Sequence, residues 1–202
     1  MSHEISTAEV VFRDLSDAFN ELSAQNLSPR KVRTVFSNFL ERAYRLTQMM
    51  YKEYRQKKGR AWEANSFQGW NSASELLKKL RRVDTHEHTV LIQVHERQYY
   101  RIDEDSPNYL VVEGTWTLGD QHADAPPEGI RLVDADPKTE QLSEDVLLPE
   151  KREYEFYLYP VTEEIEAELT QIGDRNVHSL SKKYFDTLKD YYRHYQQQLT
   201  PM

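Results

Sequence analysis

The chain has 202 residues, of which 38% are hydrophobic and 30% charged, and it contains no cysteine. This composition suffices for the core of one globular domain, and it excludes disulfide bonds, cysteine nucleophiles and cysteine-ligated metal sites. The net charge of −8 argues against a protein that coats nucleic acid through bulk attraction. No apolar run is long enough to cross a bilayer and no signal peptide is recognisable, so a cytoplasmic protein without membrane contact is expected.

Three helices are predicted in the first part of the chain. Apolar residues at helical spacing indicate a first helix over about 6–24. Ser28 and Pro29 supply an N-cap and a first-turn proline for a long second helix, which ends near Lys57 ahead of Gly59.

A third helix is predicted from Ala73 to about Arg82, because Ser72 and Glu75 match a capping box. The apolar residues that face inward on this helix are Leu76, Leu77 and Leu80.

After residue 88 the hydrophobic period changes from helical to alternating. The β-forming segments, which predict an antiparallel meander, are 89–95, 98–102, 109–118, 130–133 and 154–159. Residues 106–108 and 126–129 are turn segments, and 134–152 is expected to be an exposed loop. The apolar strand residues expected to be buried are Leu91, Val94, Val111, Trp116, Phe156 and Leu158.

The chain then returns to helix. One amphipathic helix follows Val161, and a second carries tyrosines and leucines at helical spacing from Leu180 to Tyr195. We expect the second helix to close an apolar seam that the first three helices leave open. The predicted fold is therefore α+β, with a helical bundle over 1–88, an antiparallel β subdomain over 89–160, and C-terminal helices over 161–202 that complete the bundle.

Basic residues concentrate in the helical half. Residues 28–82 contain 14 Lys and Arg against 4 Asp and Glu, whereas 89–202 contain 11 against 23. This segment can hold a phosphate backbone even in an acidic protein; the alternative is a solvated helix face that pairs with the acidic half. The candidate nucleic-acid-binding residues are Arg55, Lys57, Lys58, Arg60, Lys78, Lys79 and Arg82.

At the end of the third helix, Arg81 precedes His86 by five residues. A guanidinium binds phosphate, and an imidazole with a pKa near neutrality can take or give a proton, so this pair is the candidate catalytic site for RNA cleavage. We expect Arg81 and His86 to lie within reach of each other at the edge of a cleft, close enough to share one phosphate. In a purely structural role, Arg81 would instead form an ion pair with Glu75, Asp84 or an acid of the C-terminal half.

The order of these features resembles a bacterial branch of the HEPN superfamily. The resemblance covers roughly residues 28–90 and rests on the Phe36-x-x-Phe39-Leu40 helix, the Phe67-to-Trp70 turn and the closing Arg81-to-Glu87 motif. Where the family commonly has Asn after the arginine, this chain has Arg82. The resemblance implies a homodimer with Arg81 and His86 near the twofold axis, acting on RNA without metal or another cofactor.

Two classes of function are therefore open. The first is a metal-independent endoribonuclease of a toxin–antitoxin or phage-defence system, with RNA as substrate and an antitoxin or other protein as partner. The second is a non-catalytic, dimeric interaction module. A weaker alternative is nucleotide sensing by the sheet, with Tyr99, Tyr100 and Tyr109 as stacking groups. His86, His88 and His95 do not have the spacing of a metal site.

Overall fold

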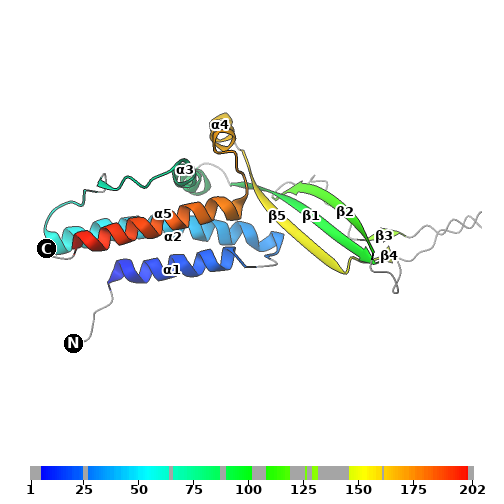
Figure 1. Ribbon diagram of the computed structural model, residues 1–202, viewed down its shortest axis with the longest axis horizontal. Coiled ribbons are helices and arrows are strands. Elements are labelled where there is room, and N and C mark those ends of the chain that lie inside the picture. Colours follow the sequence, from blue (N-terminus) through cyan, green and yellow to red (C-terminus); the bar gives the residue numbers. More distant parts are fainter. Residues whose placement is uncertain are drawn as a thin grey trace, which may run out of the picture.

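The protein is an α+β structure in which the helices and the sheet occupy different ends of the molecule. The computed structural model describes residues 6–24, 27–63, 66–86, 90–101, 108–118, 126, 129–131, 146–160 and 162–199, without the side chains at 83–86, 131 and 146. The elements in this part of the chain are α1 (Thr7–Leu22), α2 (Pro29–Lys58), α3 (Ser72–His86), β1 (Leu91–Arg101), β2 (Tyr109–Thr117), β3 (Ile130–Arg131), β4 (Val146–Leu147), β5 (Lys151–Tyr159), α4 (Glu163–Ile172) and α5 (Val177–Leu199). Figure 1 shows β1, β2 and β5 extending away from the helices; we call these three strands the β arm.

The first two helices begin and end close to where the sequence predicts. Ser6 caps α1 by accepting a hydrogen bond from the Glu9 N–H. Helix α2 begins at Pro29 and ends at Gly59, whose φ of 67° is the left-handed conformation that glycine adopts without strain. The core of the bundle is continuous with the apolar stripe of α2, which is buried from Val32 to Tyr54.

Helix α3 differs from the prediction at both of its ends. The cap is Asn71 rather than Ser72, because the Asn71 Oδ1 atom accepts hydrogen bonds from the Ser74 N–H at 2.9 Å and the Ser74 hydroxyl at 3.0 Å. Asn71 is fixed in turn by a 2.9 Å hydrogen bond from its amide to Thr187 of α5. The helix also continues past Arg82 to His86.

Helix α5 packs against the other helices of the bundle, contacting α1, α2 and α3. Its buried face includes Leu180, Tyr184, Leu188, Tyr191 and Tyr195. The tyrosines of this helix therefore belong to the core of the chain.

A buried carboxylate connects α1 to α2. Glu53 accepts a 3.0 Å hydrogen bond from the Ala8 N–H in the first turn of α1 and pairs with Lys57 at 2.5 Å. Burial raises the pKa of the Glu53 carboxyl, but the hydrogen bonds from Lys57 and Ala8 outweigh burial and hold the pKa below its usual value.

The sheet is not the predicted meander. Its strand order is β2-β1-β5, all antiparallel, and β3 pairs with β4 in a separate two-stranded sheet. Strand β1 is continuous where two strands were expected, and 146–147 and 151–152 are strand rather than loop. Because β1 is the central strand, it pairs with β5, which follows β2 in the sequence only after residues 119–145. Local sequence does not specify a pairing between segments so far apart. The predicted turn at 106–107 and most of 119–145 lie outside the described residues.

Of the six strand residues expected to be buried, only two are buried in the structure. Val94 and Leu158 are buried, whereas Val111 is 43% exposed. The three that are half-buried are Leu91, Trp116 and Phe156. The prediction was wrong because the β arm extends beyond the helices, so several of its side chains have no apolar layer to pack against.

The β arm is joined to the bundle at the start of α5. Tyr157 of β5 forms an antiparallel bridge with Asn176, and the Leu158 N–H donates to the Arg175 carbonyl at 2.8 Å. The arm and α5 are therefore linked through main-chain hydrogen bonds.

Candidate nucleic-acid interface

Helix α3 presents three basic side chains to one cavity. Arg81 and Arg82 follow Lys78 by three and four residues, and this spacing places all three on one side of the helix. The opposite side is held in the core by the leucines predicted to face inward, Leu76, Leu77 and Leu80, all of which are buried. This side-chain pattern fixes the orientation of the basic face.

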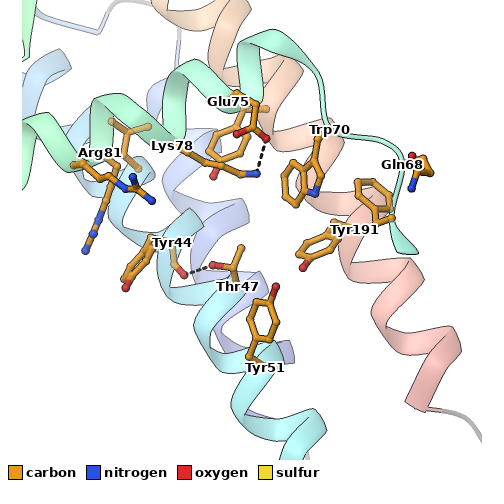
Figure 2. A pocket seen from close by; sticks show the side chains of 13 residues that line it. Tyr44, Thr47, Tyr51, Gln68, Trp70, Glu75, Lys78, Arg81 and Tyr191 are labelled. Carbon is orange, nitrogen blue, oxygen red and sulfur yellow. Dashed lines mark hydrogen bonds and ion pairs between the residues drawn. The ribbon is translucent and has the colours of Figure 1, made fainter. Parts of the chain in front are cut away.

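The cavity, which we call the α3 cavity, has a volume of about 590 Å³ and lies between α2, α3, α5 and the segment before α3. Figure 2 shows Tyr44, Thr47 and Tyr51 of α2 on one wall, with Lys78 and Trp70 facing them. Its volume falls within the range of about 300–1,000 Å³ that small-molecule sites occupy. The lining combines cations with aromatic rings, which is the composition expected of a nucleotide site.

Arg81 lies at the edge of this cavity and has partners within the chain. Its Nη2 and Nε atoms lie 3.1 and 3.2 Å from the Glu41 Oε2 atom of α2. The guanidinium also stacks on Tyr44, with the Cζ atom 3.7 Å from the ring centroid, and the side chain is 18% exposed. Glu41, which the sequence did not suggest as a partner, is therefore one of the acids that pair with Arg81.

Lys78 lies over an aromatic ring of the same cavity. Its Nζ atom is 3.2 Å from the Trp70 ring centroid and donates a 2.9 Å hydrogen bond to Glu75 (Figure 2). The ammonium is therefore held by a ring and a carboxylate, and it lies where a ligand that enters the cavity would meet Trp70.

Lys79 is directed away from the α3 cavity. One residue corresponds to 100° around a helix, and this rotation places Lys79 against α4. There it donates hydrogen bonds to Glu164, at 2.8 Å, and to Glu168, and these bonds raise the pKa of Lys79 above its usual range. Of the candidate binding residues on α3, Lys79 is the one that the structure does not bring to the site.

The basic residues near the end of α2 form a separate group. Arg55 follows Glu41 by 14 residues, so it lies about 21 Å further along the helix than the carboxylate that pairs with Arg81. Within this group, Lys57 pairs with Glu53 and Arg60 with Glu63. Lys58 and Arg55 are exposed at the same end. The basic segment of the sequence therefore does not form one surface.

The position of His86 is described only through its backbone. Because α3 is continuous from Arg81 to His86, the two residues are separated by about 7.5 Å along the axis and about 140° around it. The His86 side chain, Glu87 and His88 lie outside what the structure describes.

The cavity walls contributed by α2 and α5 were not predicted. Tyr44 and Tyr51 are one heptad apart, and both are exposed beside the apolar stripe of α2. Two aromatic residues one heptad apart, outside the apolar stripe of the helix, were the feature of the sequence that could have indicated this cavity wall. Tyr191 of α5 also lines the cavity. It follows α3 by more than 100 residues, so nothing local in the sequence relates the two.

The sheet suits the alternative nucleotide site less well than the α3 cavity does. Tyr100 is buried, and the Tyr99 hydroxyl donates a 2.5 Å hydrogen bond to Glu153. Arg97 lies on the same face of β1 as Tyr99, and its guanidinium pairs with two carboxylates. Its Nε atom lies 2.7 Å from the Glu113 Oε1 atom, and its Nη1 atom lies 3.7 Å from the Glu155 Oε1 atom. These carboxylates would repel a phosphate.

Comparisons of the chain with protein-family models, curated proteins and solved structures found no match. In the part of the chain that the structure describes, no three His, Asp or Glu side chains group as metal ligands would. None of the described helices has the length and apolar character needed to span a bilayer.

Proposed function

We propose that this chain is a HEPN-like RNA-binding protein that acts as a metal-independent endoribonuclease of a bacterial toxin–antitoxin or phage-defence system. The observation that carries the proposal is the α3 cavity, where Lys78, Arg81 and Arg82 meet the rings of Tyr44 and Trp70. Cations bind the phosphates of a single strand and aromatic rings stack its bases, so this lining suits unpaired RNA.

In the proposed reaction, Arg81 stabilises the charge that develops on the phosphate, and His86 moves a proton to or from the reacting oxygen atoms. The RNA 2′-hydroxyl attacks the adjacent phosphorus, and the 5′-oxygen of the next nucleotide leaves. Because α3 separates positions 81 and 86 by about 140°, a site completed by a second copy suits these residues better than a site within one chain. This argument favours the homodimer that the HEPN resemblance implies.

The test is cleavage of a fluorescent single-stranded RNA by the purified full chain in EDTA. We expect fragments with 2′,3′-cyclic phosphate ends, no cleavage of DNA of the same sequence, and at least a hundredfold loss of rate in His86→Ala and Arg81→Ala. Lys182→Ala is the matched control, because it removes an exposed cation that pairs with Asp186 on α5, outside the cavity. Cleavage that persists unchanged in His86→Ala would refute the catalytic assignment.

A non-catalytic dimeric module is the second candidate, and the environment of Arg81 favours it. A guanidinium that is 18% exposed, paired with Glu41 and stacked on Tyr44, is already engaged in a structural role. Under this alternative the chain forms a dimer in light scattering, binds a protein partner and leaves RNA intact in the same assay.

A further inference from the structure

The inner wall of the α3 cavity is a cluster of three aromatic rings. The Trp70 and Tyr191 centroids are 4.7 Å apart, and Phe67 lies 5.5 Å from Trp70 and 5.1 Å from Tyr191. Tyr191 is buried in the bundle, whereas Trp70 is only half-buried. Trp70 is therefore held from behind by α5 while part of its surface remains accessible.

The Lys78 ammonium covers one face of the Trp70 ring. A cation 3.2 Å from the ring centroid leaves no room for an apolar side chain on that face. Lysine ends a flexible four-carbon chain, so its ammonium can move away without a change in the backbone of α3. In Figure 2, this face is directed toward the space between α2 and α3.

We propose that this face of Trp70 is the stacking site for one unpaired base of an RNA strand, and that Lys78 covers it until the strand binds. The inference rests on the proposed function, because it assumes that the cavity binds RNA. When the base stacks on Trp70, the ammonium of Lys78 moves from the ring to the strand's phosphates, beside Arg81 and Arg82.

Relative strengths favour this exchange. A base stacked on an aromatic side chain contributes about 5- to 150-fold in affinity, whereas an exposed cation over a ring contributes about 2- to 5-fold. The displaced ammonium also gains a phosphate as a partner. Recognition by stacking does not depend on base identity, since every base has a π face. The site therefore selects unpaired nucleotides rather than a sequence.

The experiment compares two fluorescent 2′-O-methyl octanucleotides, which lack the attacking hydroxyl. One carries bases and the other is abasic throughout, with the same number of phosphates. For the wild-type full chain, fluorescence anisotropy should give at least fivefold tighter binding of the base-bearing strand. Trp70→Ala should remove this preference while changing the affinity for the abasic strand less than twofold, and Trp70→Phe should retain most of it.

Lys78→Ala tests the exchange without altering the aromatic cluster. It should weaken binding of the abasic strand, because a cation is lost, and increase the preference for bases, because Trp70 is uncovered. Tyr159→Ala is the control: it removes a 45% exposed tyrosine of β5 that does not line the cavity, and both affinities should stay unchanged.

The contrary outcomes separate the two proposals. If the base-bearing and abasic strands bind the wild type equally, the stacking site is refuted while RNA binding stands. If neither strand binds at low salt, the proposed function is refuted and the stacking site with it. Uridine monophosphate should compete only at concentrations at least a hundredfold above the Kd of the octanucleotide, and competition near that Kd would overturn the assignment to a strand.

Discussion

Replacing Glu41 by Gln should strengthen RNA binding, although it removes an ion pair. The Glu41 carboxylate lies 3.1 Å from Arg81, so any phosphate that binds the guanidinium must compete with it. Partly exposed pairs of this kind contribute about 0.2–1 kcal/mol. A carboxylate about 7 Å from a bound phosphate adds repulsion of up to about 0.6 kcal/mol in water before screening.

Together these terms predict binding that is about two- to tenfold tighter in Glu41→Gln. If Arg81 then neutralises one more phosphate, the plot of log K against log salt steepens by about 0.7 for a single strand. Folding stability should fall by no more than about 1 kcal/mol, a decrease of about 2–4 °C in Tm.

The assay is anisotropy of a fluorescent RNA with chain made non-cleaving by His86→Ala, titrated at four salt concentrations. Glu9→Gln is the matched control, because it also removes a carboxylate paired with an arginine, Arg13 on α1, outside the cavity. Affinity that is unchanged or weaker in Glu41→Gln, with an unaltered salt slope, would show that Arg81 does not contact phosphate and would favour the interaction module.

Three further predictions concern stability and are measured by denaturant or thermal unfolding. Glu53→Gln should lower the free energy of unfolding by about 1–2 kcal/mol at pH 7, since a charged acceptor becomes neutral. The pKa of Glu53 in the folded chain lies below its usual value near 4.5, so this stabilisation is present above pH 4.5 and disappears as the pH falls through the folded pKa. A cost that does not change with pH would contradict this reasoning. Asn71→Ala should cost about 0.5–2 kcal/mol through loss of the α3 cap, and an unchanged Tm would mean that another group caps the helix. Gly59→Ala should cost about 1 kcal/mol from backbone strain alone, because nothing lies within 4 Å of the added Cβ atom; Gly59→Asn should cost less, and equal costs would disagree with this cause.

The sequence predicts those features whose determinants are local. Pro29 and Gly59 bound α2 through fixed or permissive φ angles, so both of its ends could be predicted. The cap of α3 was misplaced by one residue, because Asn71 and Ser72 are both good caps and the contact that favours Asn71, with Thr187, is distant in sequence.

The parts that could not be predicted depend on pairing between distant segments. Strand β5 pairs with β1 across more than 40 intervening residues, and the residues of neither strand specify which strand it pairs with. At the candidate site, Arg81 was identified from the motif, but Glu41 and Tyr44 were not. They precede Arg81 by about 40 residues and reach it only because α2 and α3 pack together.

The position of α5 in the chain has a consequence for synthesis. Helix α5 is the last described element to leave the ribosome, yet it supplies Tyr184 and Tyr191 to the α3 cavity and the buried face that closes the bundle. Because domains form as their segments emerge during translation, α1, α2 and α3 can associate early but the cavity cannot be completed until α5 is released. A nascent or prematurely terminated chain therefore lacks a complete α3 cavity, and under the proposed function it would not yet cleave the message that encodes it.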